Sequence, residues 1–234
     1  MSGHSKWATT KHKKAIKDSK RSSLFTKLAK IITIAARDGN DQSMNFKLRM
    51  AVDKAKSLSM PKDNIERAIE RGSGTGDSGP LEEITYEGYG PEGIALIMEI
   101  VTDNRNRIAS EIRHILSKNG GSLGETNSVM WQFERKGVIY LKTEKINEEQ
   151  ELEIIDAGAE DIENDEDGIR VITAMENLQK IQEKLSAKFE IDNVELEYLP
   201  KNKIKIENKV KMENFFEALD ECDDINNFYS NAKM

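Results

Sequence analysis

The spacing of apolar residues changes at a glycine-rich stretch, and this change limits the folds that the chain can adopt. Apolar residues recur at helical spacing up to Gly72, whereas strand-like runs follow residue 80. We therefore expect residues 73–80 to be a flexible linker between a helical domain and an α+β remainder. The linker contains the string Gly-x-Gly-x-x-Gly at 74–79. A dinucleotide site needs that string between a strand and a helix, and here it follows a helix.

Residues 22–72 are predicted to form three amphipathic helices. The first begins at Ser22, a good capping residue, and ends before Asp38, and the third begins after Pro61 and ends at Gly72. Each helix has apolar residues at helical spacing: Leu24, Leu28, Ile31, Ile32 and Ala35; Met44, Leu48, Val52, Ala55 and Leu58; Ile65, Ala68 and Ile69. The short connections between them indicate a small helical domain.

Strands and one helix are predicted after the linker. Strands are expected at Ile84–Tyr86 and Ile94–Val101, and the second should be buried on both faces because its side chains are almost all apolar. An isoleucine-rich helix follows, with Asp103 as its N-cap. Alternation over Val129–Phe133, with Trp131 on the same face as both ends, predicts another strand.

Residues 136–200 are predicted to follow the order βαββαβ, the split arrangement of ferredoxin-like domains. Its helices and last strand are predicted from apolar spacing: Leu152 and Ile155; Leu178, Ile181, Leu185 and Phe189; Val194, Leu196 and Tyr198. The tail, 201–234, has a helix around Phe215 and a strand near Phe228. It is too small to fold alone, so we expect it to complete the preceding sheet.

The predicted fold class is therefore α+β with three domains. A mobile basic arm at 1–21 precedes the helical domain at 22–72 and the linker at 73–80. The middle α+β domain takes residues 81–135 together with 201–234, and the ferredoxin-like domain at 136–200 is inserted in it.

Charge is divided unevenly along the chain. Residues 2–37 hold ten Lys and Arg against Asp18, a net charge of +9, whereas residues 81–234 hold 18 basic and 34 acidic side chains, a net charge of −16. Nucleic-acid phosphates are the usual partner of such a concentrated positive charge. Residues 1–21 have no repeating apolar face, so we expect the arm to order only on binding.

The candidate binding residues are the basic and ring side chains of the arm and the first helix. They are Lys6, Trp7, Lys11, His12, Lys13, Lys14, Lys17, Lys20, Arg21, Lys27 and Lys30. Packing of Trp7 against the first helix is an equally weighted alternative, and a merely solubilising role is the alternative for the lysines. Arg105 and Arg107 at a helix N-terminus form a candidate second phosphate contact, with simple capping as the favoured alternative.

Metal sites and catalytic sets find little support in the sequence. His4 and His12 lack further ligands, and the acidic run 144–167 lacks the first Asp and last Glu of a calcium loop, so we interpret it as a solvated acidic face. His114 is interpreted as partly buried, and the pKa of Cys222 should be raised by its acidic neighbours. We expect a non-enzyme without a metal, cofactor or small-molecule substrate.

A cytoplasmic location is expected from two features. The longest apolar run, Ile94–Met98, is far too short for a membrane span, and the basic N-terminus lacks the apolar region of an export signal. The lone Cys222 suits a reducing compartment.

Several blocks of the sequence resemble the YebC/PmpR family, whose eukaryotic relatives include the mitochondrial translational activator of cytochrome oxidase subunit I. The blocks extend over essentially the whole chain: 3–8 (Gly-His-Ser-Lys-Trp-Ala), 11–15, 25–28, 60–69 (Met-Pro-Lys-Asp-Asn-Ile-Glu-Arg-Ala-Ile), 86–91, 102–107 (Thr-Asp-Asn-Arg-Asn-Arg), 157–161 and 229–232. The departures are small. Ile108 stands where the family pattern has Thr, and Met130 and Gln132 flank Trp131 where the family pattern has smaller or different residues.

The resemblance implies three domains and a cytoplasmic regulator of gene expression that binds nucleic acid. Members are described as DNA-binding transcriptional regulators, and others resemble ribosome-associated translation factors that relieve stalling. The expected partners are therefore DNA or ribosomal RNA and tRNA, and the ribosome, without a membrane. No helix carries Arg, Asn and Gln on one face as a recognition helix does, so we favour contact with RNA, with DNA as the alternative.

Overall fold

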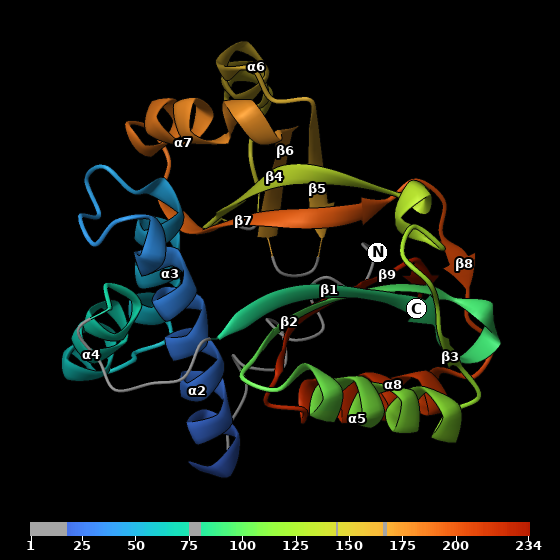
Figure 1. Cartoon of the computed structure of the whole chain (residues 1–234). Helices are drawn as coiled ribbons and strands as arrows, with labels where there is room; N and C mark the ends of the chain where they lie inside the picture. The colour runs from blue at the N-terminus through green and yellow to red at the C-terminus, as the bar shows by residue number, and fades with distance from the viewer. Residues whose placement is uncertain (1–17, 75–80, 144, 166–167) are drawn as a thin grey trace. The chain divides into compact units, whose positions relative to one another are not determined.

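The computed structural model describes residues 18–74, 81–143, 145–165 and 168–234, which form α-helices and sheets of mainly antiparallel strands (Figure 1). The described chain divides into two compact units: Glu134–Leu199 is one, and the residues up to Phe133 together with Pro200–Met234 are the other. The α+β class is confirmed. The division into three domains remains a prediction. Residues 1–17 of the predicted arm and 75–80 of the predicted linker lie outside the described residues.

Three helices precede the first sheet: α2 (Asp18–Ala35), which continues as a short 3-10 turn at Ala36–Asp38, α3 (Phe46–Ser57) and α4 (Lys62–Gly72). Their apolar stripes form one core, as predicted, with Leu28, Ile32, Leu48, Val52 and Ile65 at most 5% exposed. Buried Asn45 joins the first two helices, because its Oδ1 accepts from Leu48 N at 3.0 Å while its Nδ2 donates to Ala35 O at 2.8 Å.

Two details of these helices differ from the prediction. Helix α2 begins at Asp18, four residues before Ser22. Met44 was predicted on the buried face of the second helix, but it is 86% exposed. Asn45 is the N-cap of α3, so Met44 lies in the turn before the helix and not on its apolar stripe.

Helix α4 ends at Gly72, as predicted, but a left-handed conformation is not what requires glycine there. The positive φ belongs to Gly74, at 86°. A Cβ on Gly72 would lie 2.3 Å from Thr33 O and 2.6 Å from the Cβ of Ala36. Gly72 is therefore needed because the C-terminal ends of α2 and α4 approach each other there.

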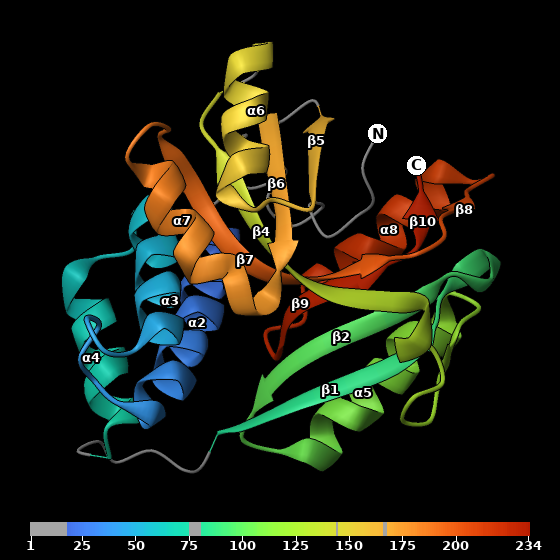
Figure 2. The same cartoon turned by 90° about the horizontal axis from the view of Figure 1, so that it is seen from above.

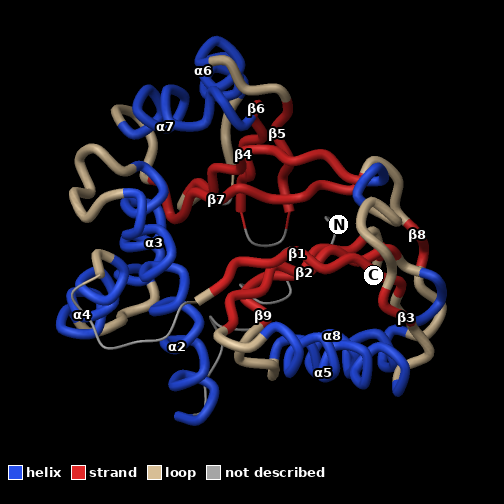
Figure 3. The backbone as a smooth tube through the Cα atoms, in the orientation of Figure 1, coloured by secondary structure: helices blue, strands red, loops and turns tan. Residues whose placement is uncertain are grey.

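A four-stranded sheet in the order β3-β1-β2-β9 follows, built from Ser122–Leu123, Glu82–Tyr89, Ala95–Thr102 and Ile225–Ser230. Strand β2 is buried on both faces, as predicted. The tail completes the sheet, as predicted, because β9 pairs antiparallel with β2, with Leu96 opposite Ser230. Figure 3 shows α5 (Arg105–Lys118) and α8 (Lys209–Asp220) side by side on one face. Their apolar sides, with Phe215 and Phe216, form its core.

Strands β8 (Ile204–Lys205) and β10 (Ala232–Lys233) form a separate parallel pair near the C-terminus. Helix α5 is capped by Asn104, whose Oδ1 accepts from Arg107 N at 3.0 Å, so the prediction of Asp103 as the N-cap was wrong by one residue. His114 lies exposed on α5, which corrects its predicted partial burial.

The strand predicted at Val129–Phe133 is also wrong. Met130–Gln132 form a 3-10 turn, Trp131 is 68% exposed, and the strand starts only at Phe133. The cause is Glu87, a buried carboxylate that accepts from the backbone N of Asn127, Val129 and Met130 at 2.6, 2.8 and 2.7 Å. Those amides converge on one side chain and are not available to a strand ladder.

The other unit contains β4 (Phe133–Leu141), α6 (Glu148–Ala157), β5 (Asp161–Asp165), β6 (Gly168–Ala174), α7 (Leu178–Ser186) and β7 (Ile191–Pro200). The predicted element order βαββαβ is confirmed, and the strands are arranged β5-β6-β4-β7 (Figure 2). Two apolar positions of α6 were misplaced: Leu152 and Ile155 are 62% and 50% exposed, and Ile154 is the buried residue.

Candidate nucleic-acid interface

Most of the predicted arm lies outside the described residues. This applies to Lys6, Trp7, Lys11, His12, Lys13, Lys14 and Lys17. Lys20 lies in the first turns of α2. Arg21 is exposed, and its Cζ lies 5.5 Å from the centre of the Phe25 ring. The described part of the predicted interface therefore begins with a cation stacked on an aromatic ring.

Lys27 and Lys30 point toward acidic residues near the end of α8. The Nζ of Lys27 donates to Asp220 O at 2.5 Å, and burial lowers the pKa of this lysine although Asp220 and its neighbours act in the opposite direction. Lys27 is only 6% exposed. Its ammonium group is satisfied inside the protein, at the negative end of the α8 dipole, and is not presented to an outside phosphate in this arrangement.

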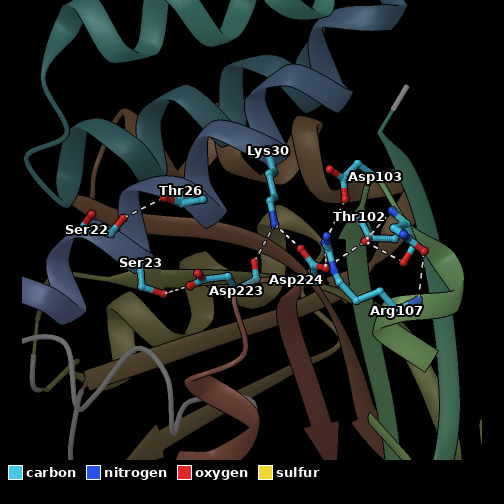
Figure 4. A network of polar contacts seen from close by, with 10 residues as sticks. Ser22, Ser23, Thr26, Lys30, Thr102, Asp103, Arg107, Asp223 and Asp224 are labelled. Carbon is cyan, nitrogen blue, oxygen red and sulfur yellow. Dashed lines mark hydrogen bonds and ion pairs between the residues drawn. The ribbon is translucent and has the colours of Figure 1, made fainter. Parts of the chain in front are cut away.

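Asp224 is the centre of a polar cluster (Figure 4). Its Oδ1 accepts from Lys30 Nζ at 2.5 Å, and its Oδ2 accepts from Arg107 Nη2 at 2.8 Å and from Thr102 Oγ1 at 2.9 Å. We call Asp224, Lys30, Arg107 and Thr102 the Asp224 cluster. Burial acts to raise the pKa of Asp224, but the hydrogen bonds from Lys30, Arg107 and Thr102 outweigh it and lower the pKa.

The backbone holds the Asp224 cluster in place. Asp224 O accepts from Val101 N at 3.0 Å, which fixes the turn after α8 beside the end of β2. Asp223 accepts from the hydroxyl of Ser23, and its carbonyl accepts from Lys30 Nζ at 2.9 Å. Both of these contacts reach helix α2, so the turn ties that helix to the sheet.

The two arginines predicted as a second phosphate contact lie at the start of α5 and differ in their contacts. Arg107 Nη2 also donates to Asp103 Oδ1 at 2.9 Å, and the guanidinium remains about half exposed, at 52%. Hydrogen bonding to Asp224 raises the pKa of Arg107 further, so it stays charged. Arg105 lies exposed in the first turn of the helix.

A cleft of about 520 Å³ lies beside the Asp224 cluster. Helix α2 lines it with Ser22, Phe25, Thr26, Ala29, Lys30 and Thr33, and α4 lines it with Asn64, Arg67, Ala68 and Arg71. Met60, Leu81, Asp103, Arg107 and Asp224 complete the lining. Four basic side chains face two acidic ones here, so the lining has a net positive charge.

Arg67 and Arg71 of this cleft were missed by reasoning from the sequence alone. The Nε of Arg67 donates to Asp63 O at 3.1 Å and its Nη2 to Asn64 Oδ1 at 2.6 Å. The spacing of Asn64, Arg67 and Arg71 places them on one stripe of a helix, and that pattern was the available signal. It was overlooked because the surrounding segment has a balanced net charge.

The described residues include neither a candidate metal site nor an activated thiol. Within the described ranges, no group of three His, Cys, Asp or Glu side chains could hold a metal ion. Burial raises the pKa of the Cys222 thiol to about 11, with Glu111 as a further cause. The predicted direction was right, but the main cause is burial and not the charge of the neighbouring sequence.

Fold and site together define an α+β protein with a cation-lined cleft beside its basic N-terminal helix. A family model described as "TACO1/YebC protein N-terminal domain" matches residues 5–75, and one described as "TACO1/YebC second and third domain" matches residues 81–232. The chain belongs to the TACO1/YebC family, which confirms the resemblance seen in the sequence.

Relatives across the full length carry the name probable transcriptional regulatory protein. One from Thermotoga maritima is 47% identical over 240 residues, covering 100% of this chain and 94% of its own. Another, from Chlorobaculum tepidum, is 48% identical over 240 residues and is covered to 96%. These names describe regulators of transcription.

A solved structure has a similar fold. The crystal structure of a conserved hypothetical protein from Aquifex aeolicus is similar with a TM-score of 0.82 at 36% identity, over 92% of this chain and 91% of that one. Among the helices of the described segments, none has both the length and the apolar character that crossing a membrane requires.

Proposed function

We propose that this protein is a non-enzymatic regulator of gene expression that binds nucleic-acid phosphates through its basic N-terminal arm. The observation that carries the proposal is the charge division, +9 over residues 2–37 against −16 over residues 81–234. Binding of a nucleic-acid backbone to the first segment is favoured by counterion release, and the negative charge of the second segment repels the same backbone. Binding is therefore directed to one end of the chain.

The working target that we propose is RNA on the ribosome, where the protein acts as a cytoplasmic translation factor. A lysine-rich arm that orders on binding suits structured RNA, which is recognised by shape and phosphate contacts. Among the described helices, none combines Arg, Asn and Gln on one exposed face as a major-groove recognition helix does. The names of the relatives favour a second candidate, a DNA-binding transcriptional regulator.

A deletion experiment tests the contribution of the arm. Helix α2 starts at Asp18, so removal of residues 2–17 takes away five lysines and leaves the described helix whole. We expect the intact protein to sediment with ribosomes through sucrose at low salt and to be released at high salt, and the truncated protein to stay at the top. A thermal unfolding midpoint equal to that of the intact chain would show that the fold is kept.

A matched control shows whether ribosome binding depends on where the positive charges lie or only on their number. In the arm variant, Lys11, Lys13, Lys14 and Lys17 are changed to Gln. In the control, the exposed Lys180, Lys201, Lys203 and Lys209 are changed to Gln, with the same loss of charge. Only the arm variant should lose ribosome binding. Equal losses of ribosome binding by the two variants would contradict the assignment of the binding site to the arm. Binding to duplex DNA but not to ribosomes would favour the transcriptional candidate. Incubation with labelled RNA or DNA and magnesium should yield no cleavage.

A further inference from the structure

The cleft beside the Asp224 cluster is bounded by one continuous face from each of two helices. The α2 residues at its wall lie three or four positions apart, at 22, 25, 26, 29, 30 and 33, and so do the α4 residues at 64, 67, 68 and 71. The volume of about 520 Å³ falls in the range of small-ligand sites, roughly 300–1,000 Å³.

The positive charges of this cleft differ in how far they are already neutralised. Lys30 and Arg107 share the carboxylate of Asp224, and Arg107 also pairs with Asp103, so two carboxylates balance these two cations. Arg67 and Arg71 form no ion pair within the described ranges, and the hydrogen bonds of Arg67 go to neutral oxygens. One helical turn separates them, so both guanidinium groups can reach a single phosphate.

An aromatic ring lines the same cleft. Phe25 is half-buried on α2, and the guanidinium of Arg21 lies over its ring at 5.5 Å. Unpaired bases stack on such aromatic side chains and on arginine planes, which is how single strands are commonly held. Two arginines for a phosphate and a ring for a base are the chemical requirements of a nucleotide.

We propose that this cleft binds an unpaired nucleotide of a single strand, with its phosphate at Arg67 and Arg71 and its base against Phe25. The inference rests on the proposed nucleic-acid-binding function and adds a second contact site to the arm. A base that enters the cleft cannot be paired at the same time, so single strands are preferred over duplexes. The arm supplies affinity for any polyphosphate, and the cleft selects strands with an unpaired end or loop.

The test is a binding titration of the full chain with fluorescein-labelled single-stranded pentanucleotides, one of RNA and one of DNA. The cleft variant carries Arg67→Gln and Arg71→Gln. The matched control carries Arg113→Gln and Lys118→Gln on α5, two exposed charges away from the cleft lining. We expect the cleft variant to bind the pentanucleotide about tenfold more weakly. Its salt slope should fall by about 1.4, which corresponds to two lost phosphate contacts on a single strand. The control should be unchanged.

A third variant distinguishes a nucleotide from a simple anion. Phe25→Leu keeps an apolar side chain and removes the stacking surface, so pentanucleotide binding should weaken by roughly five-fold or more. Competition by inorganic pyrophosphate should be unaffected. Unchanged pentanucleotide binding by this variant would overturn the proposed contact between the base and Phe25. Equal pentanucleotide affinities of the cleft variant and its control would overturn the proposal that the cleft binds a nucleotide.

The proposal for the arm and the proposal for the cleft can be contradicted separately. If the cleft is wrong, the cleft variant still binds ribosomes and pentanucleotides like the intact protein. If the arm is wrong, removal of residues 2–17 leaves ribosome binding intact whatever the cleft variant does. RNA and DNA pentanucleotides that bind equally would assign the cleft to the phosphate and base, and a preference for RNA would add a contact to the 2′-hydroxyl.

Discussion

Each of the two compact units holds a charged network, and the two networks differ in how far they are open to solvent. In the unit Glu134–Leu199, Arg170 donates to Glu163 Oε2 at 2.6 Å and to Glu197 Oε2 at 3.1 Å, and the side chains of Arg170 and Glu197 are 2% and 1% exposed. In the Asp224 cluster the carboxylate is 9% exposed, but its partner Arg107 is 52% exposed. The Arg170–Glu197 pair of the first network is closed to solvent, whereas the Asp224 cluster has an open side at Arg107.

The closed network runs across a whole sheet. Arg170 of β6 stands opposite Tyr140 of β4 and Glu163 of β5, and Tyr140 donates to Glu197 of β7. We call these four residues the Arg170 row. Burial, followed by the Glu197 carboxylate, raises the pKa of Tyr140 well above its ordinary value, so the phenol stays a donor. Arg170 pairs with Glu163 on the neighbouring strand β5 and with Glu197 two strands away on β7, so the buried charges have partners of opposite sign.

This difference separates a structural network from one that a ligand can reach. In the Arg170 row Arg170 and Glu197 are buried and only Glu163, at 31%, is partly exposed, so loss of the Arg170–Glu197 pair should lower stability. In the Asp224 cluster, Lys30 and Arg107 lie at the wall of the cleft, so a loss there should cost less stability.

The largest effect is expected from Arg170→Met. This change leaves the Glu197 carboxylate buried without its cation, which typically costs about 3–5 kcal/mol. The free energy of unfolding from urea titration measures it. The exposed Lys180→Met is the control, expected within about 0.5 kcal/mol of the intact protein. A loss below about 1 kcal/mol would show that the row is not structural.

Asp224→Asn should have the next largest effect. The amide keeps the shape but removes the charge that Lys30 and Arg107 share, and a hydrogen-bonded buried group of this kind is worth about 1–3 kcal/mol. The same urea titration applies, with the exposed Asp156→Asn as the control. If Asp224→Asn destabilised the protein as much as Arg170→Met, the contrast between the two networks would be lost.

The contribution of Asp224 to stability should depend on pH. The pKa of Asp224 is lowered in the folded protein from its ordinary value of 3.8. The unfolded chain therefore takes up the proton first on acidification. The contribution of Asp224 is present above pH 3.8 and is lost as the pH falls through the folded pKa. The difference in unfolding free energy between the intact protein and Asp224→Asn should be constant from about pH 7 to about pH 5 and shrink toward about pH 3. A difference that grew on acidification would contradict the assigned sign.

The smallest effect is expected from Arg107→Gln. It removes the same kind of arginine–carboxylate contact as Arg170→Met, but at a half-exposed side chain, where such a pair is worth about 0.2–1 kcal/mol. Arg113→Gln on the same helix is the control. A loss of more than about 2 kcal/mol, measured by the same titration, would mean that the cluster is as closed as the Arg170 row.

Where sequence reasoning failed, a side chain distant in the sequence was responsible. The strand predicted at Val129–Phe133 became a turn because its amides bond to Glu87, more than forty residues earlier for Val129 and Met130. The buried face of α6 was misplaced by one residue, since Leu152 and Ile155 are exposed and Ile154 is buried. Short helices with several apolar residues do not define their buried side by spacing alone.

Four features of the protein follow from the sequence alone: the α+β class, the three N-terminal helices, the βαββαβ order of residues 136–200 and the separation of charge. These properties depend on the period of side chains along one element and on composition, and both are local. Only the tertiary structure decided which charges meet. Lys30 and Asp224 are 194 positions apart, and Arg67 and Arg71 line one cleft with Phe25 only because α2 and α4 pack together. Contacts of this kind arise when elements far apart in the chain are folded against one another, and no local spacing records them.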